Sequence, residues 1–194
     1  MSVHRRTLVA AAGLGALATR SVLAADDILE PDQVPPVPSV PPSGSPGEFA
    51  FLAGRWTIRH RRLPSGATEW DRFNGEATCW TVLGGAGSVE ELRIPERGFS
   101  GMGLRLLDMQ RHVWSDFWVN AKSGALTTPG QEGGFVNGTG LFWSDDVDDG
   151  NRTVRYLCIW DRITPRSCRW RQVSSSDDGR TWLHHWIMDW QRVG

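Results

Sequence analysis

The side chains with the greatest potential for binding chemistry in this chain are its tryptophans and the arginines and histidines placed among them. Eleven tryptophans occur in 194 residues, and several are four residues apart, as in Trp114 to Trp118 and Trp182 to Trp186 to Trp190. That spacing keeps the side chains on one face of a β-strand. Such rows of flat apolar rings either fill the interior of a sheet structure or line an apolar pocket.

If the rings line a pocket, the sequence predicts a binding site for a small, largely apolar molecule. The tryptophans would form the wall, and Arg169 or Arg171 would meet an anionic or polar end of the ligand, because a buried guanidinium is costly unless it is paired or hydrated. The alternative is a solid interior, with arginines stacked on the tryptophans from outside. The candidate ligand-binding residues are Trp56, His60, Trp118, Trp160, Arg169, Arg171, His184 and Trp186.

An enzyme is a separate hypothesis, with a lyase, isomerase or hydrolase reaction inside the same structure. His60, Asp116 or His184 would then act as acid or base, and a pocket that holds a histidine and a carboxylate within hydrogen-bond reach would favour it. The chain lacks G-x-S-x-G, C-x-x-C, H-E-x-x-H and a glycine-rich phosphate loop followed by Lys. We therefore predict no catalytic residues, and a structural or interaction protein remains a further alternative.

No metal site is predicted either. The acidic run that starts at Asp145 fails the calcium-loop template, because its third position is Val147 and its twelfth is Tyr156. Adjacent residues on a strand point to opposite faces, so His184 and His185 cannot share a metal. The three cysteines are an odd number for an exported protein, and we expect buried free thiols.

Residues 1–25 are predicted to be an export signal peptide. A basic start with paired Arg5 and Arg6 precedes a short apolar run, and small residues allow cleavage after Ala24. The paired arginines resemble a twin-arginine signal, although His4 stands where that signal usually has Ser, so the general secretory route stays open. The mature protein is expected to be periplasmic or secreted.

The net charge of the predicted mature protein restricts the classes of partner that it can bind. Cleavage after residue 24 or 25 leaves 18 basic and 22 acidic residues, which is a net charge of -4. No basic excess remains to hold nucleic acid or an anionic membrane surface. We expect a small-molecule partner, no nucleic acid and no stable membrane insertion after the signal is removed.

The elements that must position these side chains are strands. Residues 26–47 hold seven of the eleven prolines and are predicted to be a stiff linker, and residues 48–194 form one domain. Strand-type runs separated by turn residues predict an all-β fold, a single antiparallel barrel of about nine strands after one helical turn at residues 48–53. The runs are 55–63, 69–82, 88–94, 101–107, 112–120, 133–143, 152–163, 167–175 and 181–192.

Two turns set a provisional register for the last three strands. A loop at Pro165 and Arg166, and an S-x-D-x-G-x-T-W turn that starts at Ser175, place Arg171 opposite both Trp160 and Trp186. One face would then carry the arginines and tryptophans together and point inward. The side chains on that face would be Tyr156, Cys158, Trp160, Arg169, Arg171, Val173, Trp182, His184, Trp186, Met188 and Trp190. A slip of one residue would reverse this assignment.

The first and last strands carry a family resemblance. Gly54-Arg55-Trp56 is a G-x-W signature and Arg192 ends the last strand, which resembles the lipocalin and calycin superfamily. The resemblance implies a barrel whose first-strand Trp closes one end beneath the C-terminal Arg. More closely, the chain resembles a bacterial family of unknown function, the DUF1579 type. The resemblance is carried by Phe-Leu-Ala-Gly-Arg-Trp, Ile159-Trp160-Asp161, Asp177-Asp-Gly-Arg-Thr-Trp182 and Trp186-Ile-Met188. The resemblance implies a calycin-like β-barrel and does not indicate which ligand it would bind.

A haem-binding barrel is the remaining alternative for a cofactor. Small haem-binding barrels related to nitrobindin place a ligating His late in the chain, where this sequence has His184 and His185. Their longer glycine-rich first-strand motif is missing here. No cofactor is therefore predicted in the leading hypothesis, and haem belongs to the alternative.

Overall fold

The computed structural model describes residues 33–148 and 150–194, and these form a β-structure with three short 3-10 turns. The predicted export signal lies outside the described residues. No helix in the described ranges is long and apolar enough to cross a membrane. The strands are β1 (Gly54–Arg62), β2 (Asp71–Val82), β3 (Gly87–Ile94), β4 (Phe99–Asp108), β5 (Val113–Asn120), β6 (Gln131–Val136), β7 (Thr139–Val147), β8 (Thr153–Asp161), β9 (Ser167–Ser175) and β10 (Leu183–Arg192).

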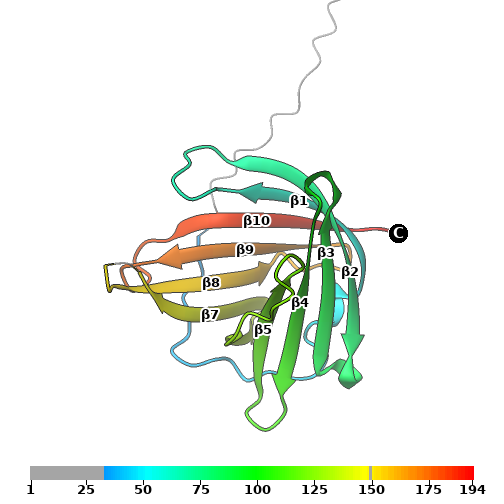
Figure 1. The fold of residues 1–194 in the computed structure, drawn as a ribbon. Helices are drawn as coiled ribbons and strands as arrows, with labels where there is room; N and C mark the ends of the chain where they lie inside the picture. Colours follow the sequence, from blue (N-terminus) through cyan, green and yellow to red (C-terminus); the bar gives the residue numbers. More distant parts are fainter. Residues whose placement is uncertain (1–32, 149) are drawn as a thin grey trace, which may run out of the picture. The chain divides into compact units, whose positions relative to one another are not determined.

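Each strand pairs antiparallel with its neighbours in the sequence, and β1 pairs with β10 to close the barrel (Figure 1). The predicted all-β barrel is thus confirmed, with ten strands instead of about nine. The extra strand arises because the run 133–143 turns back at Asn137 and Gly138, whose φ values are 51° and 77°. A two-residue loop with positive φ at both positions is a preferred hairpin turn, and Asn-Gly is its usual sequence.

One end of the barrel is closed by Trp56. Its side chain is 1% exposed, its Nε1 donates to the Leu52 carbonyl at 2.7 Å, and Leu52 belongs to η1 (Ala50–Leu52). The Arg192 guanidinium lies 4.2 Å from the Trp56 ring centroid and donates to the carbonyls of Phe51 and Ala53. This is the closure that the family resemblance implied.

The proline-rich segment is part of the compact unit from Gln33 onward. Val34 and Val37 pack on an outer-face cluster of β7, β8 and β9, and Gly44 donates its backbone N–H to the His112 carbonyl at 2.6 Å. Residues 33–47 therefore cover the barrel, where the sequence predicted a spacer. The covered apolar residues are Leu141, Leu157, Ile159 and Val173, each at most 2% exposed.

The register of the last three strands differs from the prediction by one residue. Thr164 and Ser167 do pair at the turn. Arg162, with a φ of 50°, is one extra residue between β8 and this turn, so Trp160 lies opposite Trp170. On the other side of β9, a bulge at His185 shifts the pairing of β10 with β9 by one residue. Because side chains alternate along a strand, each shift moves residues to the opposite face of the barrel.

The S-x-D-x-G-x-T-W segment is a hairpin turn, as predicted. The Asp177 carboxylate accepts from the Thr181 N–H at 2.9 Å and the Thr181 hydroxyl at 2.7 Å. Ser175 Oγ donates to Asp177 at 2.8 Å and accepts from the Gly179 N–H at 2.8 Å. Trp182 packs beneath it on the outer-face cluster, so these side chains hold the loop together.

The closure at Trp56 yields the first prediction. Trp56→Ala should lower the free energy of unfolding by about 3–5 kcal/mol, because a fully buried ring is lost and a cavity remains. Chemical denaturation of Trp80→Ala is the matched control, since the Trp80 side chain is 47% exposed on β2. Equal stability of the two variants would contradict the closure.

Candidate functional site

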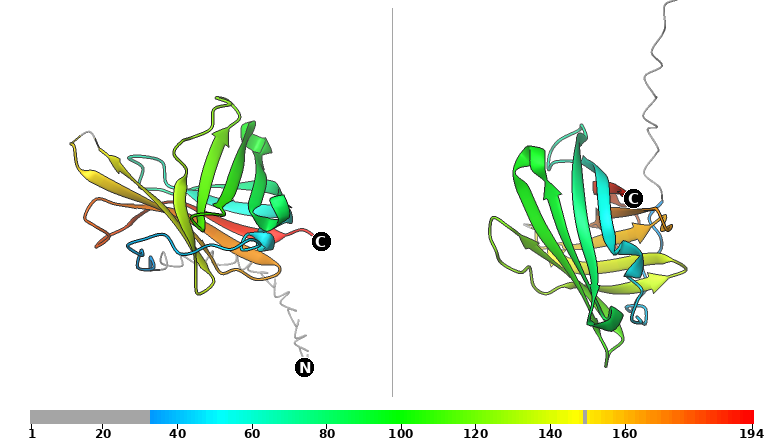
Figure 2. Two further views of the ribbon diagram at one scale, coloured as in Figure 1. Left: turned by 90° about the horizontal axis from the view of Figure 1, so that it is seen from below. Right: turned by 90° about the vertical axis from the view of Figure 1, so that its right-hand side faces the viewer.

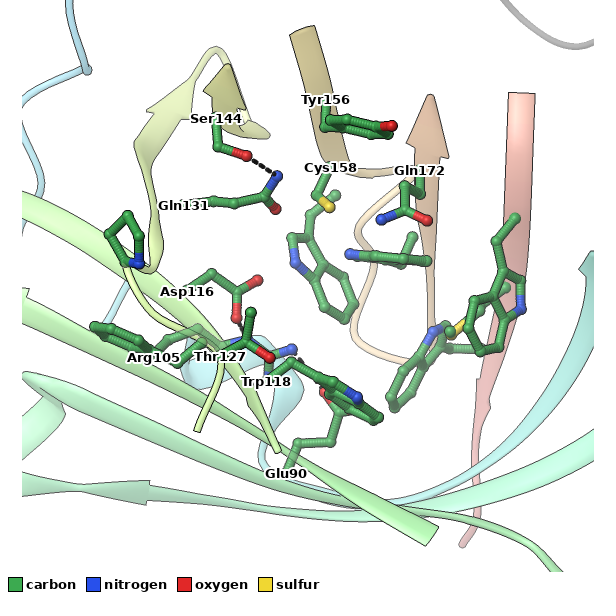
Figure 3. A pocket seen from close by; sticks show the side chains of 17 residues that line it. Glu90, Arg105, Asp116, Trp118, Thr127, Gln131, Ser144, Tyr156, Cys158 and Gln172 are labelled. Carbon is green, nitrogen blue, oxygen red and sulfur yellow. Dashed lines mark hydrogen bonds and ion pairs between the residues drawn. The ribbon is translucent and has the colours of Figure 1, made fainter. Parts of the chain in front are cut away.

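A cavity of about 370 Å³ occupies the barrel interior on the inner side of the Trp56 closure (Figure 3). Figure 2 shows the two curved halves of the barrel that enclose the interior, with β2–β5 in green and β7–β10 in yellow to red. The wall is mostly apolar and aromatic, which is typical of small-molecule sites of this size. Its apolar lining residues are Phe117, Trp118, Pro129, Cys158, Trp160, Trp170, Trp186, Met188 and Trp190.

Glycines on β4 make room for the large groups on this wall. A Cβ on Gly101 would collide with the Trp118 ring, and a Cβ on Gly103 would come within 2.8–3.1 Å of three atoms of the Arg105 guanidinium. Gly101, Gly103 and Arg105 alternate along β4, so they share the inner face. The two glycines therefore let a tryptophan and an arginine lie flat against the strand.

The cavity floor holds a buried ionic cluster of Glu90, Arg105 and Asp116. Arg105 Nη2 lies 2.7 Å from Glu90 Oε2, and Arg105 Nε lies 3.2 Å from Asp116 Oδ1. The three side chains are 4%, 5% and 12% exposed, which places the charges under the cavity and away from bulk solvent. Figure 3 shows them together on one side of the pocket. Two carboxylates against one guanidinium leave one excess negative formal charge.

Aromatic rings surround the guanidinium of this cluster. The Arg105 Cζ atom lies 5.3 Å from the Trp160 ring centroid and 5.6 Å from that of Phe49. Trp160 in turn packs against Trp190, whose ring contacts Trp56. The ionic floor is thus continuous with the aromatic core that closes the barrel.

Burial and charge shift the pKa values in the cluster. Burial raises the pKa of Asp116 to about 6 and Glu90 adds to the rise, while the Arg105 guanidinium lowers it. Burial alone would lower the pKa of Arg105, but the Asp116 and Glu90 carboxylates raise it. Arg105 therefore stays charged, and Asp116 changes charge near neutral pH.

Four buried N–H donors of residues that line the cavity make no hydrogen bond within the described part of the chain. They are Arg105 Nε, Arg105 Nη1, Trp160 Nε1 and Trp190 Nε1, and the acceptor Glu90 Oε2 is likewise without a hydrogen bond. Buried polar atoms are normally paired, and an unpaired one costs about 1–3 kcal/mol. These atoms are themselves fully buried, so they lie beneath the cavity surface and do not face its open space.

Polar side chains also lie across the cavity from the ionic cluster. Gln131 Nε2 donates to Ser144 Oγ at 3.1 Å, and Tyr156 and Gln172 line the same space (Figure 3). These groups are uncharged at neutral pH and can each donate and accept.

Five of the predicted site residues lie in the barrel interior. Trp118, Trp160 and Trp186 line the cavity, and Trp56 lies in the closed end. His60 stacks on Phe73 with ring centroids 4.6 Å apart. It accepts a hydrogen bond from Trp186 Nε1 at 3.1 Å, behind the wall. Burial lowers the pKa of His60 to about 4, with a smaller contribution from the Arg97 charge, so His60 is neutral at physiological pH.

The prediction that Arg169, Arg171 and His184 line the cavity is wrong. The register shift places both arginines on the outer face, where Arg169 makes two hydrogen bonds to Asp161 at 2.7 and 2.8 Å and Arg171 makes one at 2.6 Å. His184 lies opposite the outer-face Val173 because the bulge follows it. Trp170 and Gln172 take the inner positions of β9.

The sequence reasoning missed Glu90 and Arg105, although it named Asp116. The available signal was the alternation Gly101-x-Gly103-x-Arg105, in which small residues share a strand face with one large charged residue. All three cysteines are free and buried, as predicted, and Cys158 lines the cavity. Burial raises the pKa of the Cys158 thiol, so it remains neutral.

Comparisons with known proteins add no name to this site. No protein-family model matches the chain, and a search of curated proteins found no match. The function is therefore argued from the geometry of the cavity and its floor.

The shifted pKa values predict opposing effects of pH on stability. Asp116 has a higher pKa in the folded state than its ordinary 3.8, so its contribution to stability is lost as pH rises through about 4 to 6. His60 has a lower pKa than its ordinary 6.5, so its contribution is lost as pH falls through about 6.5 to 4. The two effects partly cancel in the native protein.

Removal of the Asp116 carboxyl should make the effect of His60 on the pH dependence of stability measurable. Between pH 4 and 6, the unfolding free energy of Asp116→Asn should rise with pH more steeply than that of the native protein, by roughly 2–3 kcal/mol over the window. Glu132→Gln, on an exposed carboxylate, serves as the control. The unfolding free energies are measured by urea denaturation at each pH. If they depended on pH equally in all three proteins, Asp116 would have an ordinary pKa in the folded protein.

Proposed function

We propose that this protein binds a small, largely apolar molecule inside the barrel. The observation that carries the proposal is the cavity of about 370 Å³ with five tryptophans in its wall. Its volume lies in the usual range for ligand pockets, and its charged groups are gathered in one cluster. An open volume among the rings supports binding over the alternative in which tryptophans fill the interior.

Catalysis is not part of the proposal. The acid–base hypothesis requires a histidine and a carboxylate within hydrogen-bond reach in one pocket. Asp116 lines the cavity, but none of the described residues that line it is a histidine, and His60 bonds to Trp186. Without a histidine beside them, Asp116 and Arg105 can recognise a polar group but do not form the required acid–base pair.

Haem binding is supported less well than apolar ligand binding. His184 faces outward, and a ring nitrogen of His185 lies 2.7 Å from Ser174 Oγ in a hydrogen bond. Neither residue belongs to the cavity lining. Arg169 and Arg171 bind Asp161 on the outer face, so neither guanidinium meets an anionic ligand end inside the cavity.

We also propose that the chain is exported to the periplasm or secreted, and that it belongs with the DUF1579 barrels. The paired arginines, the apolar run and the small residues before Ala25 support export. The G-x-W signature on the first strand of a closed barrel, with Arg192 over Trp56, supports the family placement.

Export has a direct test. The native protein should begin near Ala25 on N-terminal sequencing, because the signal peptide is removed during transport. Lysines in place of Arg5 and Arg6 should block export by the twin-arginine route. A native protein that begins at Met1 or Ser2 would contradict export, and unimpaired export of the lysine variant would indicate the general secretory route.

Ligand binding can be measured with N-phenyl-1-naphthylamine, a neutral apolar dye whose fluorescence rises in apolar surroundings. The dye should bind saturably, and Trp118→Ala should weaken it about tenfold, because Trp118 supplies a large part of the wall. Trp80→Ala is the matched control, since Trp80 is on the exposed surface of β2. Equal affinity for both variants, or no saturable binding, would contradict a site in this cavity.

A further inference from the structure

The Asp116 carboxylate is the charged group that the cavity wall presents most openly to a ligand. Its side chain is 12% exposed, whereas those of Arg105 and Glu90 are 5% and 4% exposed. Figure 3 shows the Asp116 side chain directed from β5 into the pocket. The atoms of Arg105 and Glu90 that lack hydrogen bonds are fully buried beneath the surface. A ligand that enters the cavity therefore meets Asp116 before the other two charges.

The protein does not satisfy the charge of Asp116 by itself. Arg105 Nη2 lies 2.7 Å from Glu90, whereas Arg105 Nε lies 3.2 Å from Asp116 Oδ1. Neither contact is a hydrogen bond, because Arg105 Nε and Glu90 Oε2 both lack one within the described part of the chain. A carboxylate in apolar surroundings is costly unless it is paired and hydrogen-bonded. A ligand with positive charge and N–H donors would supply both to Asp116.

The other titratable groups of the cavity lining do not offset this negative charge. Glu90 on β3 and Asp116 on β5 carry two negative charges against one positive charge on Arg105 of β4. Cys158 and Tyr156 on β8 carry no positive charge, and burial raises the pKa of the Cys158 thiol. Where the dielectric is low, such an excess attracts a cation and repels an anion. A neutral donor would leave the charge of Asp116 uncompensated.

The groups next to Asp116 are also suited to an ammonium ion. Trp118 lies two residues along β5, so its ring shares the inner face with Asp116. A tryptophan ring attracts a cation through its π-face. Gln131 lies opposite Asp116 in the pairing of β5 with β6, and its Nε2 donates to Ser144 at 3.1 Å. Its Oε1 atom is thus the part of the amide that can accept from a ligand.

On the basis of the binding function proposed above, we propose that the ligand is a small apolar amine whose ammonium group pairs with Asp116. An ammonium has donors and no acceptor, so it can donate to Asp116 and to Gln131 Oε1 together. Removal of the ammonium from water is costly, and the carboxylate, the amide oxygen and the Trp118 ring offset that cost. The apolar part of the amine packs against the remaining tryptophans of the wall.

Three probes of similar size test the charge of the ligand by calorimetry at pH 7.5. They are 2-phenylethylamine, 2-phenylethanol and phenylacetate, which end in a cation, a neutral group and an anion. The amine should bind at least about tenfold more tightly than the alcohol, because hydrogen bonds between charged groups are stronger than neutral ones. Phenylacetate should bind most weakly, because its charge lies beside Asp116.

A lower pH should weaken binding of the amine in particular. Burial raises the pKa of Asp116 to about 6, so at pH 5.0 about one-tenth of the free protein retains this negative charge. The amine of the probe, like that of lysine, stays positively charged at both pH values. Its affinity should therefore fall about tenfold between pH 7.5 and 5.0, while the affinity for 2-phenylethanol changes less than twofold.

A matched pair of variants separates Asp116 from the general negative charge of the protein. Asp116→Asn should weaken binding of 2-phenylethylamine about tenfold at pH 7.5, remove its pH dependence and leave the affinity for 2-phenylethanol within about twofold. Glu132→Gln removes an exposed carboxylate on the neighbouring strand β6 and should change neither affinity. If Asp116→Asn does not fold, the pH series on the native protein still decides the question.

The outcomes distinguish the amine assignment from the proposed function. Binding of 2-phenylethanol or phenylacetate as tightly as the amine at pH 7.5 would overturn the assignment and leave the apolar cavity intact. Equal loss of amine binding in Glu132→Gln and Asp116→Asn, or amine binding that does not change with pH, would overturn the role of Asp116. If none of the three probes binds, the assignment fails, and the proposed function fails with it only if N-phenyl-1-naphthylamine does not bind either.

Discussion

The placement of one buried positive charge constrains much of this barrel's interior. Arg105 projects inward from β4, and a buried guanidinium is tolerated only when it is paired. Glu90 on β3 and Asp116 on β5 supply the partners from the two neighbouring strands, and Gly103 leaves the space in which the guanidinium lies. Removal of one partner from such a buried cluster typically costs about 3–5 kcal/mol.

The packed aromatic core and the cavity share side chains. Phe49, Trp56, Trp160 and Trp190 belong to the core under the Arg192 cap, and Trp160 and Trp190 also line the open space. Glu90, Arg105 and Asp116 are the only charged groups among the described residues that line the cavity, and they lie together on one side of it.

Several strands carry apolar residues on both faces because part of the outer face of the barrel is also covered. Strands β7, β8 and β9 carry a second apolar cluster that Val34 and Val37 cover. Sequence periodicity alone does not show which of two apolar faces points inward, so the interior was assigned through turn geometry. Fold class, the helical turn before β1 and the hairpin turn at Asp177 could be predicted from strand patterns and turn motifs, and the Trp56 closure was what the resemblance to calycins implied.

The candidate site could be predicted only in part. Trp118 and Trp186 were identified from their spacing and Trp160 from the provisional strand register, and all three do line the cavity. Arg169, Arg171 and His184 were misplaced because a positive φ at Arg162 and a bulge at His185 each add one residue to a strand. Neither feature has a sequence signature as clear as Asn137-Gly138, and the pairing of Glu90 with Arg105 depends on strand register.

The most direct test of the central claim is a crystal structure of the protein soaked with N-phenyl-1-naphthylamine. We expect the dye in the space between Trp118, Trp170 and Trp186. An interior in which the tryptophan rings meet and exclude the ligand, with Arg105 turned away from Glu90 and Asp116, would contradict it.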